Sequence, residues 1–281
     1  MRKPGAPFFL FLCACLTLFI LQARPSSSQA IEDEREFSYE QGSPNGPDHW
    51  GEIHKEWATC NNGDMQSPID LTHERVKILP GLGRLKRNYR ASNATLKNRG
   101  HDIMLEWVEG GGWIRINGNE YQLKQCHWHS PSEHTVDGKR FDLEIHMVHE
   151  SSDEKIAVVG IIYKTGRPDT FLSELMEHIK EVADTEEKET NVGIVDPRHI
   201  KIGSRKYYRY MGSLTTPPCT QGVVWTITKK VRTVSREQVR LLREAVHDSA
   251  ENNARPIKPI NQREIQFYTP RIHESDQHFP H

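Results

Sequence analysis

The stretch Gln125-Cys126-His127-Trp128-His129 decides how the rest of the chain is interpreted. In an extended strand, successive side chains point to opposite faces. Gln125, His127 and His129 therefore share one face of the strand. Cys126 and Trp128 point to the other face. Because two imidazoles converge on one side, the stretch predicts part of a metal site built on a β-sheet.

A second strand, expected over residues 141–150, supplies a third imidazole. It follows a turn at Asp137-Gly138, and Glu144, His146 and Val148 line one of its faces. If the two strands are antiparallel neighbours, His146 completes a site of three nitrogens. Three neutral imidazoles leave the fourth zinc position open, which is the arrangement of a catalytic rather than a structural zinc ion.

The surroundings of these histidines also suit a metal. Gln125 and Glu144 each lie two residues before a proposed ligand on its own face, so either can accept the outward imidazole N–H. The chain has fifteen histidines, so the spacing alone leaves a chance cluster open. His134 is expected to be a buried, hydrogen-bonded core residue. His149 points away from His146, and neither His134 nor His149 is expected to be a ligand.

Most other patterned segments are typical of strands, so a mainly β protein is expected. The strand segments are 103–108, 113–117, 121–129, 141–150, 155–164, 207–214 and 223–228. Two helices are predicted: an apolar stripe over 171–179, and a capping box of Ser235 and Gln238 before 239–246. The polar, Glu-rich stretch 181–191 is expected to be a solvated loop.

Length and charge narrow the function classes. The 281 residues suit one large or two small globular domains, and the net charge is −1. No long basic block is present, which argues against nucleic acid as the main partner. A small or neutral ligand is more compatible with this charge.

Residues 1–30 are predicted to be a secretory signal peptide. Arg2 and Lys3 precede an apolar run over 8–21 and the small-residue stretch 26–30. The run is shorter than the roughly 20 residues that span a bilayer, although an uncleaved anchor is the alternative. Cleavage removes three basic and no acidic residues, so the mature chain 31–281 is expected to be mildly acidic and to have no membrane span.

The secretory route bears on the cysteines. Two of the five lie in the signal, which leaves Cys60, Cys126 and Cys219. Cys126 lies in the proposed metal strand, so Cys60 with Cys219 is the preferred disulfide, and three free thiols are the alternative. Asn93-Ala94-Thr95 is an N-glycosylation sequon, so Asn93 is a candidate glycan acceptor.

A long collinear set of segments resembles the α-class carbonic anhydrases, from about residue 39 to about residue 255. The segments are Asn45-Gly46-Pro47-Asp48-His49-Trp50, Gln66-Ser67-Pro68-Ile69, Ser132-Glu133-His134-Thr135-Val136, Glu144-Ile145-His146-Met147-Val148-His149, Gly212-Ser213-Leu214-Thr215-Thr216-Pro217-Pro218-Cys219-Thr220 and Val223-Val224-Trp225. The form His-Trp-His-Ser-Pro-Ser-Glu-His is similar to plant members of the class. The resemblance implies one domain, ordered over about 37–270, with a large central, mostly antiparallel twisted β-sheet and short peripheral helices. It also implies a disulfide between Cys60 and Cys219.

The same resemblance implies zinc-dependent, reversible hydration of carbon dioxide to bicarbonate and a proton. The zinc ligands would be His127, His129 and His146, and zinc-bound hydroxide would attack carbon dioxide. Gln125 and Glu144 would be hydrogen-bond partners of these ligands, and Asn253 would contribute its backbone to His129. Sulfonamides and anions are the expected inhibitors.

Substrate handling is implied for a second group of residues. Thr215 would accept a hydrogen bond from the zinc-bound hydroxide and donate one to Glu133, while Thr216 would contact bicarbonate. The apolar pocket for carbon dioxide would be formed by Val148, Val158, Leu214, Val223 and Trp225. Considered without the family, these five are core residues.

The proton exit is assigned to His101, which matches the family's shuttle histidine, with Tyr39 organising the water chain. From its neighbours alone, His101 would be a surface residue. Arg99 and Met104 stand where better-known animal members carry polar amides, so the water network is expected to differ here.

Two rival functions come from other classes. His127 and His129 followed by Glu133 imitate part of a cupin metal motif, in which Glu133 would be a ligand. A carbonic anhydrase-like binding or storage protein without activity is the second rival, although all the proposed catalytic residues are intact. After the secretory route, the destination would be the extracellular space (apoplast) or the chloroplast.

Overall fold

The computed structural model describes residues 36–270 except 184, 186, 203–204 and 247–249. The predicted signal peptide therefore lies outside the described residues. Within the described part, no helix is both long enough and apolar enough to cross a bilayer. The described residues belong to one compact unit.

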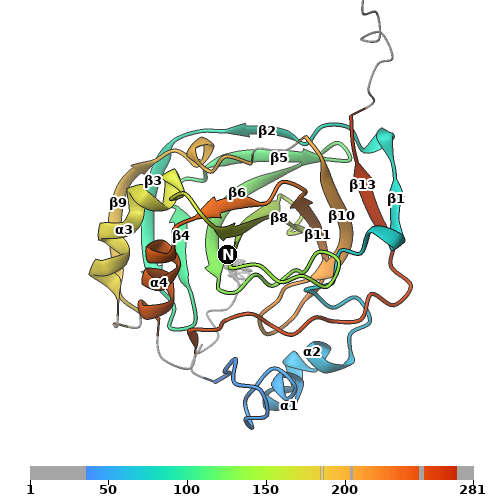
Figure 1. Cartoon of the computed structure of the whole chain (residues 1–281), viewed down its shortest axis with the longest axis horizontal. Helices are drawn as coiled ribbons and strands as arrows, with labels where there is room; N and C mark the ends of the chain where they lie inside the picture. The colour runs from blue at the N-terminus through green and yellow to red at the C-terminus, as the bar shows by residue number, and fades with distance from the viewer. Residues whose placement is uncertain (1–35, 184, 186, 203–204, 247–249, 271–281) are drawn as a thin grey trace, which may run out of the picture. The chain divides into compact units, whose positions relative to one another are not determined.

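A single large sheet organises this unit (Figure 1). The strands follow the order β1-β13-β10-β11-β8-β7-β6-β4-β3-β9, with β12 beside β8 and with β5 joining β2 to β6. Their bounds are β1 Val76–Ile78, β2 Lys86–Tyr89, β3 Ser92–Asn98, β4 Ile103–Trp107, β5 Gly112–Ile116, β6 Asn119–His129, β7 Leu143–Ser151, β8 Ile156–Thr165, β9 Glu189–Val195, β10 Tyr207–Ser213, β11 Gln221–Thr228, β12 Arg232–Val234 and β13 Ile265–Tyr268. Among the described strands, β1 with β13, β11 with β8 and β12 with β8 are parallel, and the other pairs are antiparallel. The predicted fold class is confirmed.

The helices are short and peripheral. The α-helices are α1 Trp50–Ile53, α2 Thr59–Asn62, α3 Thr170–Val182 and α4 Arg236–Glu244, and the 3-10 turns are Lys55–Trp57, His73–Arg75, Pro80–Leu82 and Pro197–His199. The Asp169 carboxylate caps α3 by accepting from the N–H groups of Phe171 and Leu172. The predicted capping box of Ser235 and Gln238 begins α4. Both predicted helices are therefore confirmed.

The alternation of side chains along the strands separates two hydrophobic cores. Cys126 and Trp128 belong to the core that also holds Phe171 and Leu172 of α3. Residues of the opposite parity, such as Val148 and Trp225, belong to the other core. The three histidines of interest share the face of this second core, so the period of two that the sequence suggested places them correctly.

The stretch 181–191 was expected to be a loop, and this expectation is wrong at both ends. Helix α3 continues to Val182, and β9 begins at Glu189 and pairs antiparallel with β3. The polar residues mislead because β9 lies at the end of the strand order and has only one strand neighbour, so it tolerates exposed side chains. Ile194 of this strand is among the most exposed large hydrophobic residues described.

Candidate metal centre

The hairpin of β6 and β7 positions the three histidines. At its tip, Asp137 and Gly138 both have positive φ, of 49° and 74°, which is the conformation of a type I′ turn. Two reciprocal backbone hydrogen bonds between Val136 and Lys139 close the turn. In the antiparallel pairing of β6 with β7, His127 lies directly opposite His146. The predicted antiparallel arrangement of the two strands is confirmed.

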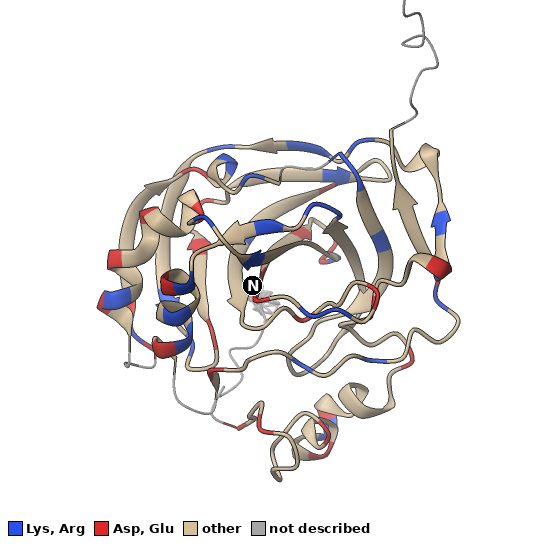
Figure 2. Ribbon diagram, in the orientation of Figure 1, with Lys and Arg blue, Asp and Glu red and all other residues tan. Residues whose placement is uncertain are grey.

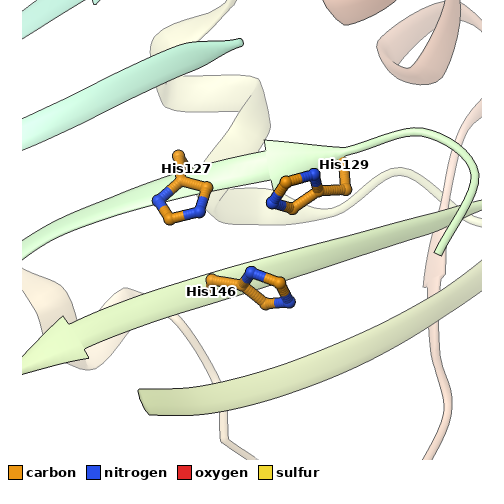
Figure 3. Close-up of side chains that lie close together, drawn as sticks. All are labelled: His127, His129 and His146. Atoms are coloured by element: carbon orange, nitrogen blue, oxygen red, sulfur yellow. The ribbon is translucent and has the colours of Figure 1, made fainter. Parts of the chain in front are cut away.

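His127, His129 and His146 bring one ring nitrogen each within 4.8 Å of one another, and all three side chains are buried (Figure 3). Figure 3 shows two of the rings projecting from β6 and the third from the neighbouring β7. A second group of close ligand atoms combines His134, Glu144 and His146. It shares His146 with the first group and is held together by the hydrogen bonds described below.

Each imidazole gives one ring N–H to an oxygen acceptor, which determines the tautomer. The distances are 2.9 Å from His127 Nδ1 to Gln125 Oε1, 2.7 Å from His129 Nδ1 to Asn253 O, and 3.0 Å from His146 Nε2 to Glu144 Oε1. The other nitrogen of each ring therefore carries a lone pair. His129 Nε2 is buried and has no hydrogen-bond partner in the structure. Three imidazoles that each keep one nitrogen free to accept a metal fit the donor set of a catalytic zinc ion.

Burial favours the neutral rings that a metal requires. Burial lowers the pKa of His127 well below its ordinary value, and it also lowers the pKa of the neighbouring His129. Burial also opposes protonation of His146, but the Glu144 and Glu133 carboxylates outweigh it and raise the pKa of that ring. A proton therefore competes with a metal mainly at His146.

Glu144 serves two histidines at once. Its Oε1 lies 2.8 Å from His134 Nδ1, and its Oε2 accepts from the backbone N–H of His134 at 2.8 Å. His134 Nε2 then lies 2.7 Å from the Tyr210 hydroxyl, which bonds to Ser67 at 2.8 Å. His134 is thus the buried, hydrogen-bonded core residue that was expected. The contacts of Tyr210 and Ser67 were not predicted, because they join segments that lie far apart in the sequence.

Glu133 lies beside the same nitrogens. Its Oε1 accepts from the backbone N–H of Arg255 at 2.9 Å, and its Oε2 lies 3.6 Å from His129 Nε2 and 3.9 Å from His146 Nδ1. Oε2 accepts no hydrogen bond within the described part of the chain. The expected bond from Thr215 to Glu133 is therefore not formed in this structure, because Oε2 faces the imidazoles instead. Thr215 itself is buried.

Arg255 is a positioning residue that sequence reasoning missed. Its side chain is fully buried and donates to three oxygens: Gln66 Oε1, Ser67 O and Cys60 O. Burial lowers its pKa to about 10, so the guanidinium remains charged at neutral pH. These bonds tie the segment around Asn253 and Arg255, whose backbone N–H donates to Glu133, to the segment that runs from Cys60 to Ser67. An arginine in an irregular region offers no periodic signal that would have revealed this role.

The loop that carries Thr215 and Thr216 is held at its far end by the predicted disulfide. Cys60 and Cys219 are bonded, which confirms the pairing, and the Cys219 N–H also donates to Thr216 O at 2.8 Å. Cys126 is a buried free thiol, as expected. The disulfide belongs to a cluster with the aromatic rings of Phe37, Tyr39, Trp50 and Trp57.

The five apolar residues assigned to the substrate pocket gather beside the histidines. Val148, Val158, Val223 and Trp225 are buried members of one cluster, and Leu214 packs against it partly buried. The Trp225 and His146 ring centroids are 4.8 Å apart. The Trp225 indole N–H donates to Ser213 O at 2.9 Å, which fixes the ring beside the metal centre.

His101 departs from the expectation drawn from its neighbours in sequence, because it is 3% exposed rather than a surface residue. The Phe37 ring covers it at 5.1 Å between centroids, and the Tyr39 ring lies at 6.3 Å. Its Nε2 is 3.5 Å from the buried carboxylate of Asp102. That carboxylate also accepts from both the Nε and Nη2 groups of Arg99.

The Arg99–Asp102 pair explains what the unusual Arg99 does. Burial alone would raise the pKa of Asp102, but the Arg99 guanidinium and the His101 ring hold it well below its usual range. Asp102 is therefore a permanent anion beside His101. Met104 is the second residue that stands where a polar amide was expected. It lies opposite His127 in the pairing of β4 with β6.

Comparison with known proteins decides the family. A family model described as eukaryotic-type carbonic anhydrase matches residues 45–269. This chain belongs to the carbonic anhydrase family. Alpha carbonic anhydrase 7 of Arabidopsis thaliana is 57% identical over 265 residues, which cover 94% of this chain and 96% of that protein. The resemblance to plant carbonic anhydrases of the α class is thereby confirmed.

Solved carbonic anhydrase-like structures share the fold. A crystal structure of dioscorin complexed with ascorbate has a TM-score of 0.82 and 51% identity, covering 84% of this chain and 98% of that chain. The α-carbonic anhydrase of Thermovibrio ammonificans, in complex with the inhibitor sulfanilamide, has a TM-score of 0.74 and 34% identity, covering 82% and 98% respectively. The cupin alternative is wrong, because the described strands form one sheet rather than a double-sheet jelly roll.

Proposed function

We propose that this carbonic anhydrase binds one zinc ion at His127, His129 and His146 and catalyses the reversible hydration of carbon dioxide to bicarbonate and a proton. The observation that carries the proposal is the set of three buried imidazoles, each fixed by one hydrogen bond with its other nitrogen turned to a shared space. Zinc held there would supply hydroxide at neutral pH, since carbonic anhydrases lower the pKa of a coordinated water to about 7.

The protein groups around the zinc position would orient the nucleophile. Glu133 is held by the Arg255 N–H and keeps Oε2 without a donor, so it can accept a hydrogen bond from a hydroxyl group beside the site. Thr215 is the hydroxyl assigned to this role, with its side chain turned to donate to Glu133 and to accept from the nucleophile. Only a nucleophile that has a proton to donate would then be bound in the productive orientation.

The apolar cluster of Val148, Val158, Leu214, Val223 and Trp225 would take carbon dioxide, which is apolar and has no dipole. Thr216, half-buried on the loop held by the disulfide, would contact bicarbonate before it leaves. An aromatic sulfonamide is expected to bind at the zinc and inhibit the reaction, as anions are.

His101 would carry the proton away from the site, with Tyr39 beside it. The buried carboxylate of Asp102 lies 3.5 Å from His101 Nε2 and can orient the ring for proton transfer.

A carbonic anhydrase-like binding or storage protein without activity is the second candidate. The similarity to dioscorin, which was solved with ascorbate bound, favours it. The two candidates differ in whether a metal occupies the three histidines and turns over carbon dioxide.

Zinc removal and restoration test the proposed function. The mature chain 31–281 is expected to contain one zinc per molecule, to lose zinc and hydration activity on dialysis against a chelator, and to regain both with zinc. His127→Ala is expected to lose the metal, whereas the control His199→Ala, at an exposed histidine paired with Glu174, should keep it. A chain that folds normally but takes up no zinc would support the binding protein.

We also propose that the chain enters the secretory pathway, with the apoplast or the chloroplast as its destination. The Cys60–Cys219 disulfide suits an oxidising compartment. The Asn93 side chain is exposed on β3, so a glycan attached to it would extend into solvent. Endoglycosidase treatment of the secreted chain should lower its apparent mass, and the Asn93→Gln variant should show no such change. An unglycosylated secreted wild type would remove Asn93 as an acceptor.

A further inference from the structure

A cavity of about 490 Å³ is lined by residues on and beside β2, β5, β10 and β11, and none of the three histidines lines it. Figure 1 labels these four strands. The cavity lining includes Tyr207, Thr226 and Thr228. These residues alternate along β10 and β11 with Tyr208 and Ile227, which belong to the core on the histidine side. The cavity therefore opens on the opposite face of the sheet from the metal centre, and its volume lies in the range of small-molecule sites.

The rim of this cavity is strongly cationic. Arg84, Lys86, Arg87 and Arg205 line it and are exposed, and no aspartate or glutamate is among the lining residues. Figure 2 shows the Lys and Arg positions along β2. Within the described part of the chain, none of these four side chains forms an ion pair. Four unneutralised cations around one hollow create a positive potential that attracts an anion.

A fifth cation, Arg209, lies behind the lining residues Thr226 and Tyr207 and is not itself part of the lining. Arg209 is only 7% exposed, and its guanidinium donates to Thr226 Oγ1 from Nε at 3.2 Å and from Nη2 at 2.9 Å. It also lies 4.9 Å from the centroid of the Tyr207 ring. No carboxylate lies within ion-pair distance among the described residues. A buried charge without a counter-ion is costly, so an anion bound next to it would be stabilised.

The cavity wall also offers an unused donor and flat apolar surface. Thr228 Oγ1 is buried and has no hydrogen-bond partner among the described residues. The Thr226 and Thr228 side chains both line the cavity. Thr226 Oγ1 accepts a hydrogen bond from Arg209, so its own hydroxyl proton can be donated to a ligand. The rings of Tyr207 and Trp113 line the wall, and Arg115 lies 4.8 Å from the Trp113 ring centroid. A planar ligand can stack there.

We propose that this cavity binds a small organic anion that joins a phosphate or sulfate group to a flat ring. The oxyanion would lie at the threonine hydroxyls and among the rim cations, where charge-assisted hydrogen bonds are strongest. The ring would pack against Tyr207 and Trp113. The site is independent of the zinc chemistry, since the two lie on opposite faces of the sheet.

Titration calorimetry on the zinc-loaded chain tests the proposal, with a saturating aromatic sulfonamide present to block the metal centre. The probes are phenyl phosphate, phenyl sulfate, inorganic phosphate and phenol. One molecule of phenyl phosphate or phenyl sulfate should bind per chain, at least about tenfold more tightly than inorganic phosphate or phenol, because only these two probes use both halves of the site. Comparison of the two esters tells which oxyanion is preferred.

Variants identify the site. Arg87→Gln and Arg205→Gln should each weaken binding of the preferred ester by roughly tenfold, as expected for loss of one charge-assisted contact. Thr228→Val keeps the side-chain shape and should weaken binding several-fold. Lys124→Gln removes one exposed positive charge from β6, outside the cavity lining, and should bind as the wild type does.

The proposal is overturned if neither ester binds better than inorganic phosphate, or if the cavity variants bind as tightly as Lys124→Gln. It is also overturned if the ester binds only when the sulfonamide is left out. Carbon dioxide hydration by Arg87→Gln and Arg205→Gln should equal that of the wild type, so failure of this site is distinguishable from failure of the enzyme.

Discussion

The Oε2 atom of Glu133 lies 3.6 Å from Nε2 of His129, and neither atom has a hydrogen-bond partner in the structure. Both side chains are fully buried. A buried carboxylate oxygen and a buried imidazole nitrogen that both lack partners are the groups that a metal and a metal-bound nucleophile would complete. The backbone N–H of Arg255 holds the other carboxylate oxygen at 2.9 Å, so Glu133 is positioned in advance.

Glu133→Gln is predicted to lower kcat for hydration by about 100- to 1,000-fold, the effect usual for losing one orienting hydrogen-bond group in an active site. The amide keeps the shape of the side chain but replaces one acceptor oxygen with a donor. Zinc content should stay at the wild-type level, because Glu133 is not a proposed ligand. Stopped-flow hydration and metal analysis measure the two effects. The control is Glu174→Gln on the exposed face of α3. Equal rates for both variants would remove Glu133 from the mechanism.

His101→Ala is predicted to slow turnover in weak buffer by at least about tenfold while leaving kcat/KM unchanged, since proton transfer to solvent follows the hydration step. Added imidazole should restore the rate by carrying the proton instead. Stopped-flow assays over a series of imidazole concentrations measure this, with His199→Ala as the control. If the variant shows no dependence on buffer, the proton leaves by another route.

Removing the disulfide with Cys60→Ser and Cys219→Ser together is predicted to lower the free energy of unfolding by about 2–5 kcal/mol, because the bond closes a loop of 159 residues. Urea unfolding with and without reductant measures the change. Reductant should destabilise the wild type and leave the double variant unaffected. A double variant as stable as the oxidised wild type would show that the aromatic cluster alone holds this segment.

His149 is predicted to make stability depend on pH. Burial lowers the pKa of His149 to about 4, while its backbone hydrogen bond to Ala157 partly opposes the shift. An unfolded chain has a histidine pKa of about 6.5, so between these values only the unfolded chain binds the proton. Neutral His149 therefore contributes its full share of the free energy of unfolding above about pH 7. About 2 kcal/mol of that free energy is lost as the pH falls from 7 to 5.

The measurement is urea unfolding at several pH values between 7 and 5 for the wild type, His149→Gln and His199→Gln. The glutamine at position 149 can still hydrogen-bond with Tyr89, whose hydroxyl lies 2.9 Å from His149 Nε2. His149→Gln should lose part of the pH dependence, and His199→Gln should keep it. Identical slopes for all three chains would contradict the assignment.

The sequence predicted those parts of the site that depend on local periodicity. The period of two along β6 and β7 placed three imidazoles on one face, and it also placed Gln125 and Glu144 next to their ligands. The capping box of Ser235 and Gln238 is equally local and was found in full.

Contacts between distant segments could not be read from such patterns. Arg255 reaches Gln66 and Cys60 across almost 200 residues, and Phe37 covers His101 from a segment far earlier in the chain. Burial of His101 is therefore a tertiary property, invisible in its polar neighbours. Edge strand β9 was missed for a related reason, since its strand character depends on the partner β3 rather than on its own alternation.

The rate of carbon dioxide hydration by the purified, zinc-loaded mature chain, followed by stopped flow at neutral pH, tests the central claim most directly. The account predicts a rate far above that of the buffer, lost on zinc removal and on addition of an aromatic sulfonamide. A folded, zinc-containing chain that hydrates carbon dioxide no faster than the buffer would contradict it and would leave the binding protein as the function.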